Sequence, residues 1–429
     1  MYERTRRRWL MRAFAAFCLA PTVAVVGFCA VKNRPGLREE QTQRLEAVLG
    51  LRVELDDYRE PLPGKLRFDG LTLKDPETGA VVFRAVRLDV RRQPLDDDPT
   101  AAVSVLVLSA DSAELSAAGF DAAASLADRA LRGWLLQPSV RIAVGRLHLE
   151  DNGRTDSFSD VQASIDQQAN GSSLRACFRW EQSPEPARVQ VVRHRQGAAA
   201  GYQVELDTRG AALPCRLLAH AWPAFAPCGD DATFRGCVWT AGGETPAADL
   251  AGELSAVDLG RLAALYSGYR FSGRANVVVR SGRIRAGRLE EGVFTLSAGP
   301  GLISRDLMEM LVSRLRTPRA AEPVHPGDLV SFEQLAFHAA VDRGGLRLHG
   351  CCAGAAPGAL LCDHRGPLLL EPVLQPQPLA AVVQVLVPGD EAPLPVSRRA
   401  QSLARLLPLP DAQYSPDSLS RQPSDNTWR

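Results

Sequence analysis

The residues of this sequence best suited to acid–base chemistry lie near its C-terminal end. Asp363, His364 and Arg365 are consecutive, and a predicted final hairpin, Phe332 to Leu361, brings His349 toward them. General-base catalysis needs a third group that positions the histidine, and the sequence identifies none. Motifs for a nucleophile elbow, a phosphate loop or a zinc-binding helix do not occur in the sequence. We therefore expect a polar surface turn, and predict that the protein is not an enzyme; a hydrolytic activity abolished by His364→Ala would contradict this.

Two charged runs are further candidates for binding. The acidic run Leu95 to Pro99 resembles a series of calcium ligands, but it lacks the ligand spacing and terminal Glu of a helix-loop-helix site, so we expect a loop tip. The basic run Arg280 to Arg288 places Arg283 and Arg285 on alternate positions. These arginines either contact anionic headgroups or form the solvated face of a strand, and the pattern favours the solvated face. No metal ion and no cofactor is predicted.

The cysteines offer disulfide chemistry. The chain has nine, of which Cys18 and Cys29 lie in an N-terminal apolar segment. The other seven permit up to three bridges in an oxidising compartment, and sequence alone does not give their connectivity. The pair most open to a local bridge is Cys352 with Cys362, because the two flank a turn rich in Gly, Ala and Pro. A zinc site is disfavoured, since no two cysteines have the usual two-residue spacing.

The N-terminal segment predicts where the protein works. Nineteen uncharged residues, Ala13 to Val31, follow five arginines between Arg4 and Arg12. A helix of about 20 apolar residues spans a bilayer, and a flanking arginine cluster tends to stay cytoplasmic. We expect residues 1–35 to form a cytoplasmic arginine cluster and a single transmembrane anchor in the inner membrane, with the body periplasmic. A cleaved signal peptide is the alternative, disfavoured because Phe28 stands where cleavage after Ala30 requires a small residue.

Composition and hydrophobic periodicity describe the body. With 429 residues, 45% hydrophobic, and a formal net charge of +1, the chain can bury a large core and has no general attraction to nucleic acid. Apolar residues alternate with polar ones, as in Leu66–Phe68 and Leu71–Leu73, and the dipeptide Asp69-Gly70 between them is typical of a turn. We predict a mainly β fold with a few short helices, in which the N-terminal transmembrane helix precedes a long, curved, mostly antiparallel sheet that resembles a groove.

The expected organisation has three parts. Residues 1–35 form the anchor, residues 36–372 form the β-rich body, and residues 373–429 form a Pro-rich, largely disordered tail. A weak repeat relates the segments near 64–92 and 140–167, since Leu66 and Leu71 of the first fall on Ile142 and Leu147 of the second. The expected helices are Leu37 to Leu49, Ala122 to Gln137, Asp258 to Tyr266, and Ile303 to Leu315 with Ser304 as its cap.

Three segments together resemble the AsmA-like family of envelope proteins. They are the anchor followed by LGLRVELDDYREPLPGKLRFDGLTLKDPETGAVVFRAVRLDV, the stretch FSGRANVVVRSGRIRAGRLEEGVFTLSAGPGLISRDLMEML, and the hairpin FEQLAFHAAVDRGGLRLHG. In that family a helix precedes a late hairpin with an Asp-x-Gly turn, the position that Asp342-Arg343-Gly344 takes here. The resemblance implies an inner-membrane anchor, a periplasmic β-groove without an active site, and a role in lipid transport or outer-membrane assembly, with lipid acyl chains and envelope proteins as partners.

The physical form of this hypothesis is a sheet whose apolar face holds a guest. Acyl chains lying on such a face gain about 0.8 kcal/mol per buried methylene. The candidate lining residues are the alternating apolar positions of the predicted strands: Leu66, Phe68, Leu71, Leu73, Val86, Leu88, Val144 and Leu147. The same residues are equally suited to the core of a closed β-sandwich. The alternative function is therefore an anchored scaffold or protein-interaction module that binds no lipid.

Overall fold

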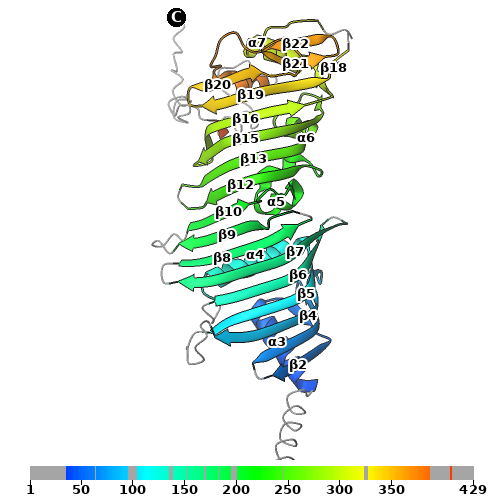
Figure 1. Ribbon diagram of the computed structural model, residues 1–429, viewed down its shortest axis with the longest axis vertical. Helices are drawn as coiled ribbons and strands as arrows, with labels where there is room; N and C mark the ends of the chain where they lie inside the picture. The colour runs from blue at the N-terminus through cyan, green and yellow to red at the C-terminus, as the bar shows by residue number, and fades with distance from the viewer. Residues whose placement is uncertain are drawn as a thin grey trace, which may run out of the picture. The chain divides into compact units, whose positions relative to one another are not determined.

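The computed structural model is mainly β, with large, mostly antiparallel sheet pairings and few helices (Figure 1). It describes residues 35–62, 64–94, 104–134, 139–151, 153–168, 171–181, 183–194, 201–243, 245–322, 327–386 and 406–407. The chain divides into two compact units. Unit 1 comprises Met1–Ser183 and Gln190–His194, and unit 2 comprises Pro184–Val189 and Arg195–Arg429, so that the boundary falls at strand β9 (Ala187–His194).

Unit 1 is a sheet with two helices of 15 residues. Its elements in chain order are α3 (Pro35–Leu49), β1 (Arg52–Glu54), β2 (Asp57–Leu62), β3 (Lys65–Lys74), β4 (Val81–Pro94), β5 (Ser104–Ser116), α4 (Ala117–Leu131), β6 (Ser139–Asp151), β7 (Arg154–Gln168) and β8 (Gly171–Trp180). Neighbouring strands pair antiparallel except β5 and β6, which are parallel. Parallel neighbours need a crossover connection, which α4 provides.

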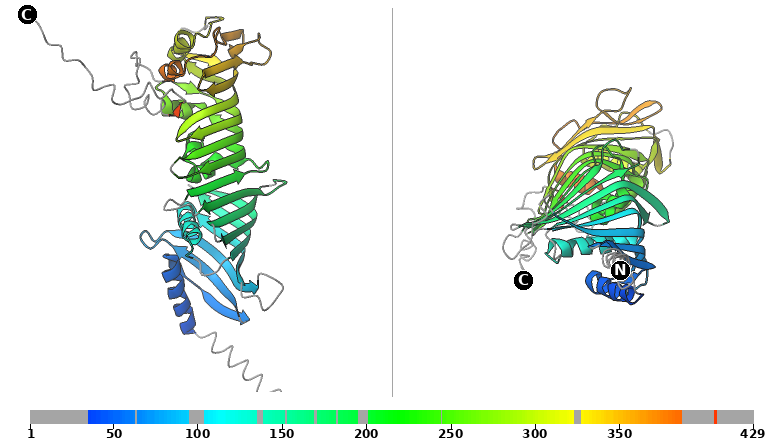
Figure 2. Two further views of the ribbon diagram at one scale, coloured as in Figure 1. Left: turned by 90° about the vertical axis from the view of Figure 1, so that its left-hand side faces the viewer. Right: turned by 60° about the horizontal axis from the view of Figure 1, so that its bottom comes forward.

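Both helices lie on the apolar face of the unit 1 strands (Figure 2). Leu45 and Leu49 of α3 pack against a core that includes Val53, Tyr58 and Phe68. Helix α4 begins with Ser116, whose side chain accepts a hydrogen bond from the Gly119 backbone. It crosses β4 to β8 and ends where Gln167 of β7 donates to the Ala130 carbonyl at 3.2 Å. The helices thus close a large part of this face.

The alternation of apolar residues shifts by one position at the same level in strands β3 to β7, a feature that we call the crease. In β3 the apolar positions are Leu66 and Phe68 before the shift, and Leu71 and Leu73 after it. The paired positions across the sheet are Val90 and Ala85 in β4, Leu108 and Ala113 in β5, Ile142 and Leu147 in β6, and Ala163 and Phe158 in β7. Two consecutive residues of each strand therefore point to the polar face, including Val86 and Arg87.

The crease corrects one prediction and accounts for another. Asp69-Gly70 is not a turn, because both residues lie inside β3. Gly70 has φ +65°, and a Cβ there would lie 1.9 Å from Asp56 Oδ2, so glycine is needed to carry the strand through the shift. The predicted repeat aligned β3 with β6, and both strands contain the shift; since β4, β5 and β7 share it, the similarity reflects the crease.

Unit 2 is a second, longer series of antiparallel strands. Its main strands are β10 (Gly201–Asp207), β11 (Leu213–Pro214), β12 (Thr233–Ala241), β13 (Ala247–Asp258), β15 (Arg274–Arg285), β16 (Arg288–Ala298), β19 (Gln334–Asp342), β20 (Gly345–Gly350), β21 (Ala359–Asp363) and β22 (Gly366–Leu370). Strands β14 (Phe271–Ser272), β17 (Gly301–Ser304) and β18 (Leu329–Phe332) form a separate small sheet.

The helices of unit 2 are short. They are α5 (Cys215–Ala221), the 3-10 helix η2 (Pro223–Cys228), α6 (Leu259–Tyr266), α7 (Arg305–Arg314) and α8 (Leu379–Leu386). Asp258 caps α6, and Ser304 caps α7 as predicted. Met308 of α7 and Leu379 of α8 join one core with Leu348 of β20 (Figure 2 shows both helices on one side of these strands).

The body does not end at residue 372. Helix α8 follows it, and Gln377 exchanges two backbone hydrogen bonds with Leu346, at 2.7 and 2.9 Å. Residues 375–386 therefore pack on unit 2, whereas Val373 and Leu374 are exposed. The rest of the predicted tail, apart from residues 406–407, lies outside the described residues. The predicted anchor, Ala13 to Val31, also lies outside them. Among the helices that are described, none has the length and apolar character to cross a membrane.

Candidate functional site: the apolar faces of the strands

Five of the eight predicted lining residues belong to a closed core. Phe68, Leu71 and Leu73 are buried, with exposed fractions of 4%, 4% and 8%. Leu66 and Leu88 pack against them in the same cluster, together with Leu45, Leu49 and Leu51. These side chains pack in the core beside α3 and stabilise unit 1; Phe68, Leu71 and Leu73 are not accessible to a guest, whereas Leu66 and Leu88 are half-buried.

The other three candidates lie elsewhere. Val86 is 75% exposed, because the crease turns it to the polar face, away from Leu88. Val144 and Leu147 are half-buried on β6, one on each side of the crease. Both therefore share the apolar face that α4 crosses.

Unit 2 has apolar positions on its strands that remain accessible. The register aligns Val204, Thr240, Ala248, Ile284 and Leu289 on one row across five strands. A parallel row joins Leu254, Val277 and Leu296. Several large side chains of this face are half-buried or exposed, and we call six of them the open strip: Val204, Leu250, Val277, Val279, Ile284 and Leu296. Ile284 is the most accessible, with 37% of its surface exposed.

Four glycines on the strands of the open strip leave positions without side chains on this face. Gly236 of β12 pairs with Gly252 of β13, and Gly282 of β15 pairs with Gly292 of β16. Gly236 and Gly252 approach so closely that a Cβ on Gly252 would lie 2.7 Å from the Gly236 Cα. Glycine inside a strand often marks close approach of another group. The four glycines lie on two adjacent rows: Gly236 and Gly252 continue the row of Val279, and Gly282 and Gly292 continue the row of Leu250.

An apolar hollow adjoins this strip. It has a volume of about 410 Å³, within the range of small-molecule sites. Val204, Ala248 and Ile284 form its floor, and Ala221 and Trp222, at the end of α5, also line it. No charged side chain lines the hollow, so its chemistry suits a hydrocarbon chain.

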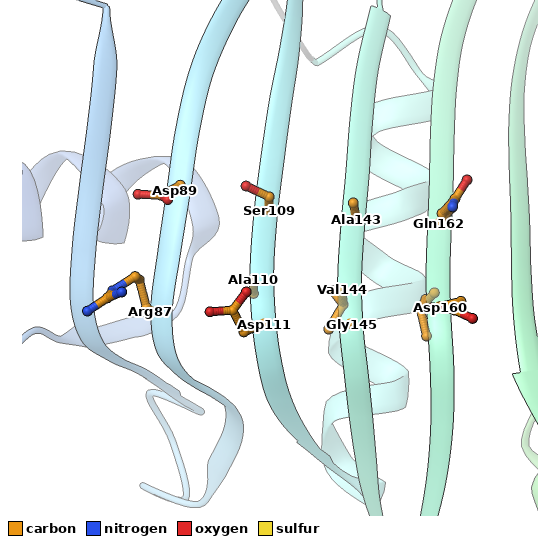
Figure 3. A pocket seen from close by; sticks show the side chains of 11 residues that line it. Arg87, Asp89, Ser109, Ala110, Asp111, Ala143, Val144, Gly145, Asp160 and Gln162 are labelled. Carbon is orange, nitrogen blue, oxygen red and sulfur yellow. The ribbon is translucent and has the colours of Figure 1, made fainter. Parts of the chain in front are cut away.

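The hollow of unit 1 has the opposite character. It has a volume of about 230 Å³ and follows the crease on the polar face. Figure 3 shows Asp89, Ser109 and Gln162 in one row, Arg87, Asp111 and Asp160 in the next, and a helix behind the strands. The pKa of Asp89 is lowered chiefly by its hydrogen bond with Arg67, at 2.9 Å. Within the described ranges, no group of three or more His, Cys, Asp or Glu side chains is arranged to hold a metal ion.

The predicted basic run lies among acidic partners. Arg285 Nη1 is 2.8 Å from Asp249 Oδ1, and Arg283 Nη1 is 3.6 Å from Glu291 Oε2. The Arg285 guanidinium also lies 5.8 Å from the Trp239 ring centroid. This arrangement matches the solvated face of a strand. The acidic run Leu95 to Pro99 lies outside the described residues.

The predicted acid–base residues near the C-terminal end contact separate partners. Asp363 Oδ1 accepts hydrogen bonds from the backbones of Arg365 and Gly366, so it organises the turn between β21 and β22. Arg365 Nε donates to His364 Nε2 at 3.3 Å, and His349 Nδ1 lies 3.5 Å from Glu371 Oε2. These contacts are the ordinary stabilisation of a turn and a strand end.

The structure brings four cysteines together in two pairs. The predicted pair, Cys352 and Cys362, is buried in one small cluster with Ala336 and Ala359, and burial raises the pKa of Cys352 to about 12. The second pair, Cys215 and Cys228, was not predicted from the sequence. All four side chains are thiols in the structure.

Comparison with known proteins does not identify a relative of this chain. The chain matches no protein-family model, and no curated protein and no solved structure resembles it significantly.

Proposed function

We propose that this protein is a membrane-anchored, extracytoplasmic β-sheet protein of the cell envelope that holds lipid acyl chains on the open strip of unit 2. The observation that carries the proposal is the combination of accessible apolar side chains, a floor of glycines and an adjoining apolar hollow of about 410 Å³. An acyl chain lying there gains about 0.8 kcal/mol for each methylene that leaves water. The proposed role of the protein is lipid transport or outer-membrane assembly.

Two features outside the strip support this proposal. Ala13 to Val31, after the arginine cluster, has the length and composition of an anchor in the inner membrane. The opposite face of the unit 2 strands carries paired charges, such as Arg285 with Asp249, that suit an aqueous compartment. The sequence resemblance to AsmA-like envelope proteins implies the same location and the same class of ligand.

Site-specific photocrosslinking tests the proposal. A photoreactive amino acid at Ile284 should form adducts with membrane lipid in cells, because this side chain lies on the open strip. The matched control is Val278, on the same strand, which is 42% exposed but points to the polar face. Equal lipid adducts at both positions, or none at Ile284, would contradict the proposal.

Unit 1 favours a second candidate function, an anchored scaffold that binds proteins and no lipid. Its apolar face is packed beneath α3 and crossed by α4, and its polar hollow carries Arg87, Asp111 and Asp160. Crosslinking of the full chain to one envelope protein in cells, with no lipid adduct at Ile284 and no lipid phenotype on deletion, would support this alternative.

A further inference from the structure

Cys215 and Cys228 are the two ends of one short segment of unit 2. Cys215 is the first residue of α5, and Cys228 is the last residue of η2. Their exposed fractions are 0% and 6%, and their thiols are in hydrogen-bonding contact. We call residues 215–228 the strap.

The backbone brings these two residues together without help from the sulfurs. Trp222 donates its backbone N–H to Leu218 at the end of α5, and η2 then returns along the helix. Cys215 donates its backbone N–H to Ala232 at 2.8 Å, which holds the start of the strap beside the chain that follows it. The Phe225 ring packs on Phe234, with centroids 5.3 Å apart. The thiols are therefore placed by the fold.

We propose that Cys215 and Cys228 form a disulfide in the mature protein, which closes the strap into a covalent loop. The loop contains Ala221 and Trp222, which line the apolar hollow. The bridge would hold this wall in place whether or not a lipid occupies the hollow. The inference rests on the positions of the two thiols and on the extracytoplasmic location in the proposed function, but it does not require bound lipid.

Because both cysteines are buried in the folded chain, the bond forms during folding, by exchange with a disulfide of another molecule, such as an oxidised dithiol protein. A thiolate of the strap attacks that disulfide and releases one thiol, and the second strap cysteine then attacks the mixed disulfide and releases the other. Two S–H bonds of the protein are replaced by one S–S bond, and the oxidant is reduced to two thiols. The hydrogen bond from Cys215 lowers the pKa of Cys228, whereas this bond and burial raise the pKa of Cys215.

Peptide mapping of the full chain tests the inference directly. Cells are lysed in an alkylating agent so that free thiols are blocked, and the protein is digested with trypsin without reduction. Arg216 lies between the two cysteines, so cleavage separates residues 210–216 from residues 217–235. We expect these two peptides to be recovered as one species, two hydrogens lighter than their sum, in most molecules, and to separate on reduction.

A second variant controls for disulfide exchange with a neighbouring cysteine. Cys237 is exposed on β12, in the adjoining tryptic peptide, and Cys237→Ser should leave the linkage unchanged. Recovery of both strap peptides in separately alkylated form would overturn the inference, as would linkage of Cys228 to any cysteine other than Cys215. The readout requires no bound lipid, so a failed bridge and a failed lipid proposal are distinguishable.

Discussion

The two units differ in how much of the apolar face of their strands is covered by helices. Each has strands with one apolar and one polar face, but unit 1 covers its apolar face with helices of 15 residues, about 22 Å long. At a strand spacing of about 4.8 Å, such a helix crosses four or five strands. The α-helices of unit 2 have 7 to 10 residues and cover less of the face. Helix length therefore separates a closed core from an accessible surface.

Removing an apolar side chain from each unit tests this difference most strongly. Leu71→Ala should lower the free energy of unfolding by about 2–5 kcal/mol, because it leaves a cavity beneath α3. Ile284→Ala should cost less than about 1 kcal/mol, since Ile284 is 37% exposed and its neighbours can relax. Urea unfolding of the full chain measures both. Similar losses for the two variants would mean that the open strip is itself a packed core.

A charge placed on the open strip tests whether an acyl chain binds to this face of unit 2. Ile284→Asp should weaken the affinity for a fluorescent acyl probe about tenfold or more, because the carboxylate would be buried under the chain without a partner. Val278→Asp adds the same charge to the polar face of the same strand and should leave the affinity unchanged. A titration that shows equal losses would assign the effect to charge in general, and would contradict a specific site.

Filling the glycine floor should have a smaller effect. Gly282→Leu should weaken acyl-probe binding about three- to tenfold, because its side chain would occupy the space that the chain needs. The substitution is structurally tolerable, since a Cβ there meets Leu250 and Val279 only at ordinary distances of 3.5 Å or more. Ala251→Leu, on the other face of β13, is the control and should bind normally. Tighter binding by Gly282→Leu would show that the acyl chain does not occupy the space next to Gly282.

The smallest expected effect is electrostatic and belongs to unit 1. Asp89→Asn should lower stability at pH 7 by at most about 1 kcal/mol, because it removes the ion pair with Arg67. The pKa of Asp89 is lower in the fold than its ordinary value, so its contribution is present above the ordinary value and is lost as the pH falls through the lowered one. Unfolding midpoints of variant and wild type should therefore converge in acid. A difference in unfolding midpoint that widens in acid would contradict a lowered pKa of Asp89 in the fold.

The sequence was sufficient for the fold class and for several local features. Alternation predicted a mainly β, mostly antiparallel structure, and Ser304 was correctly identified as a helix cap. The crease was missed because Asp69-Gly70 is typical turn chemistry, and only the pairing of β3 with β4 shows that the strand continues. Consequently Val86 was assigned to the wrong face.

The accessible surface was harder to predict than the strands. Period-two patterns show which residues share a face, but they do not show whether a helix lies on it. Leu71 and Ile284 both occupy apolar strand positions with non-apolar neighbours, yet Leu71 is 4% exposed and Ile284 is 37% exposed. The pairing of Cys215 with Cys228 likewise depends on how α5 and η2 fold back.

Mass measurement of the full chain, released intact from membranes in mild detergent, tests the central claim most directly. The account predicts that the wild-type protein and Val278→Asp carry one or more acyl lipids that survive purification. Ile284→Asp should lose most of this bound mass. A wild-type protein without lipid, or equal retention by Ile284→Asp, would contradict the claim that the open strip of unit 2 holds a guest.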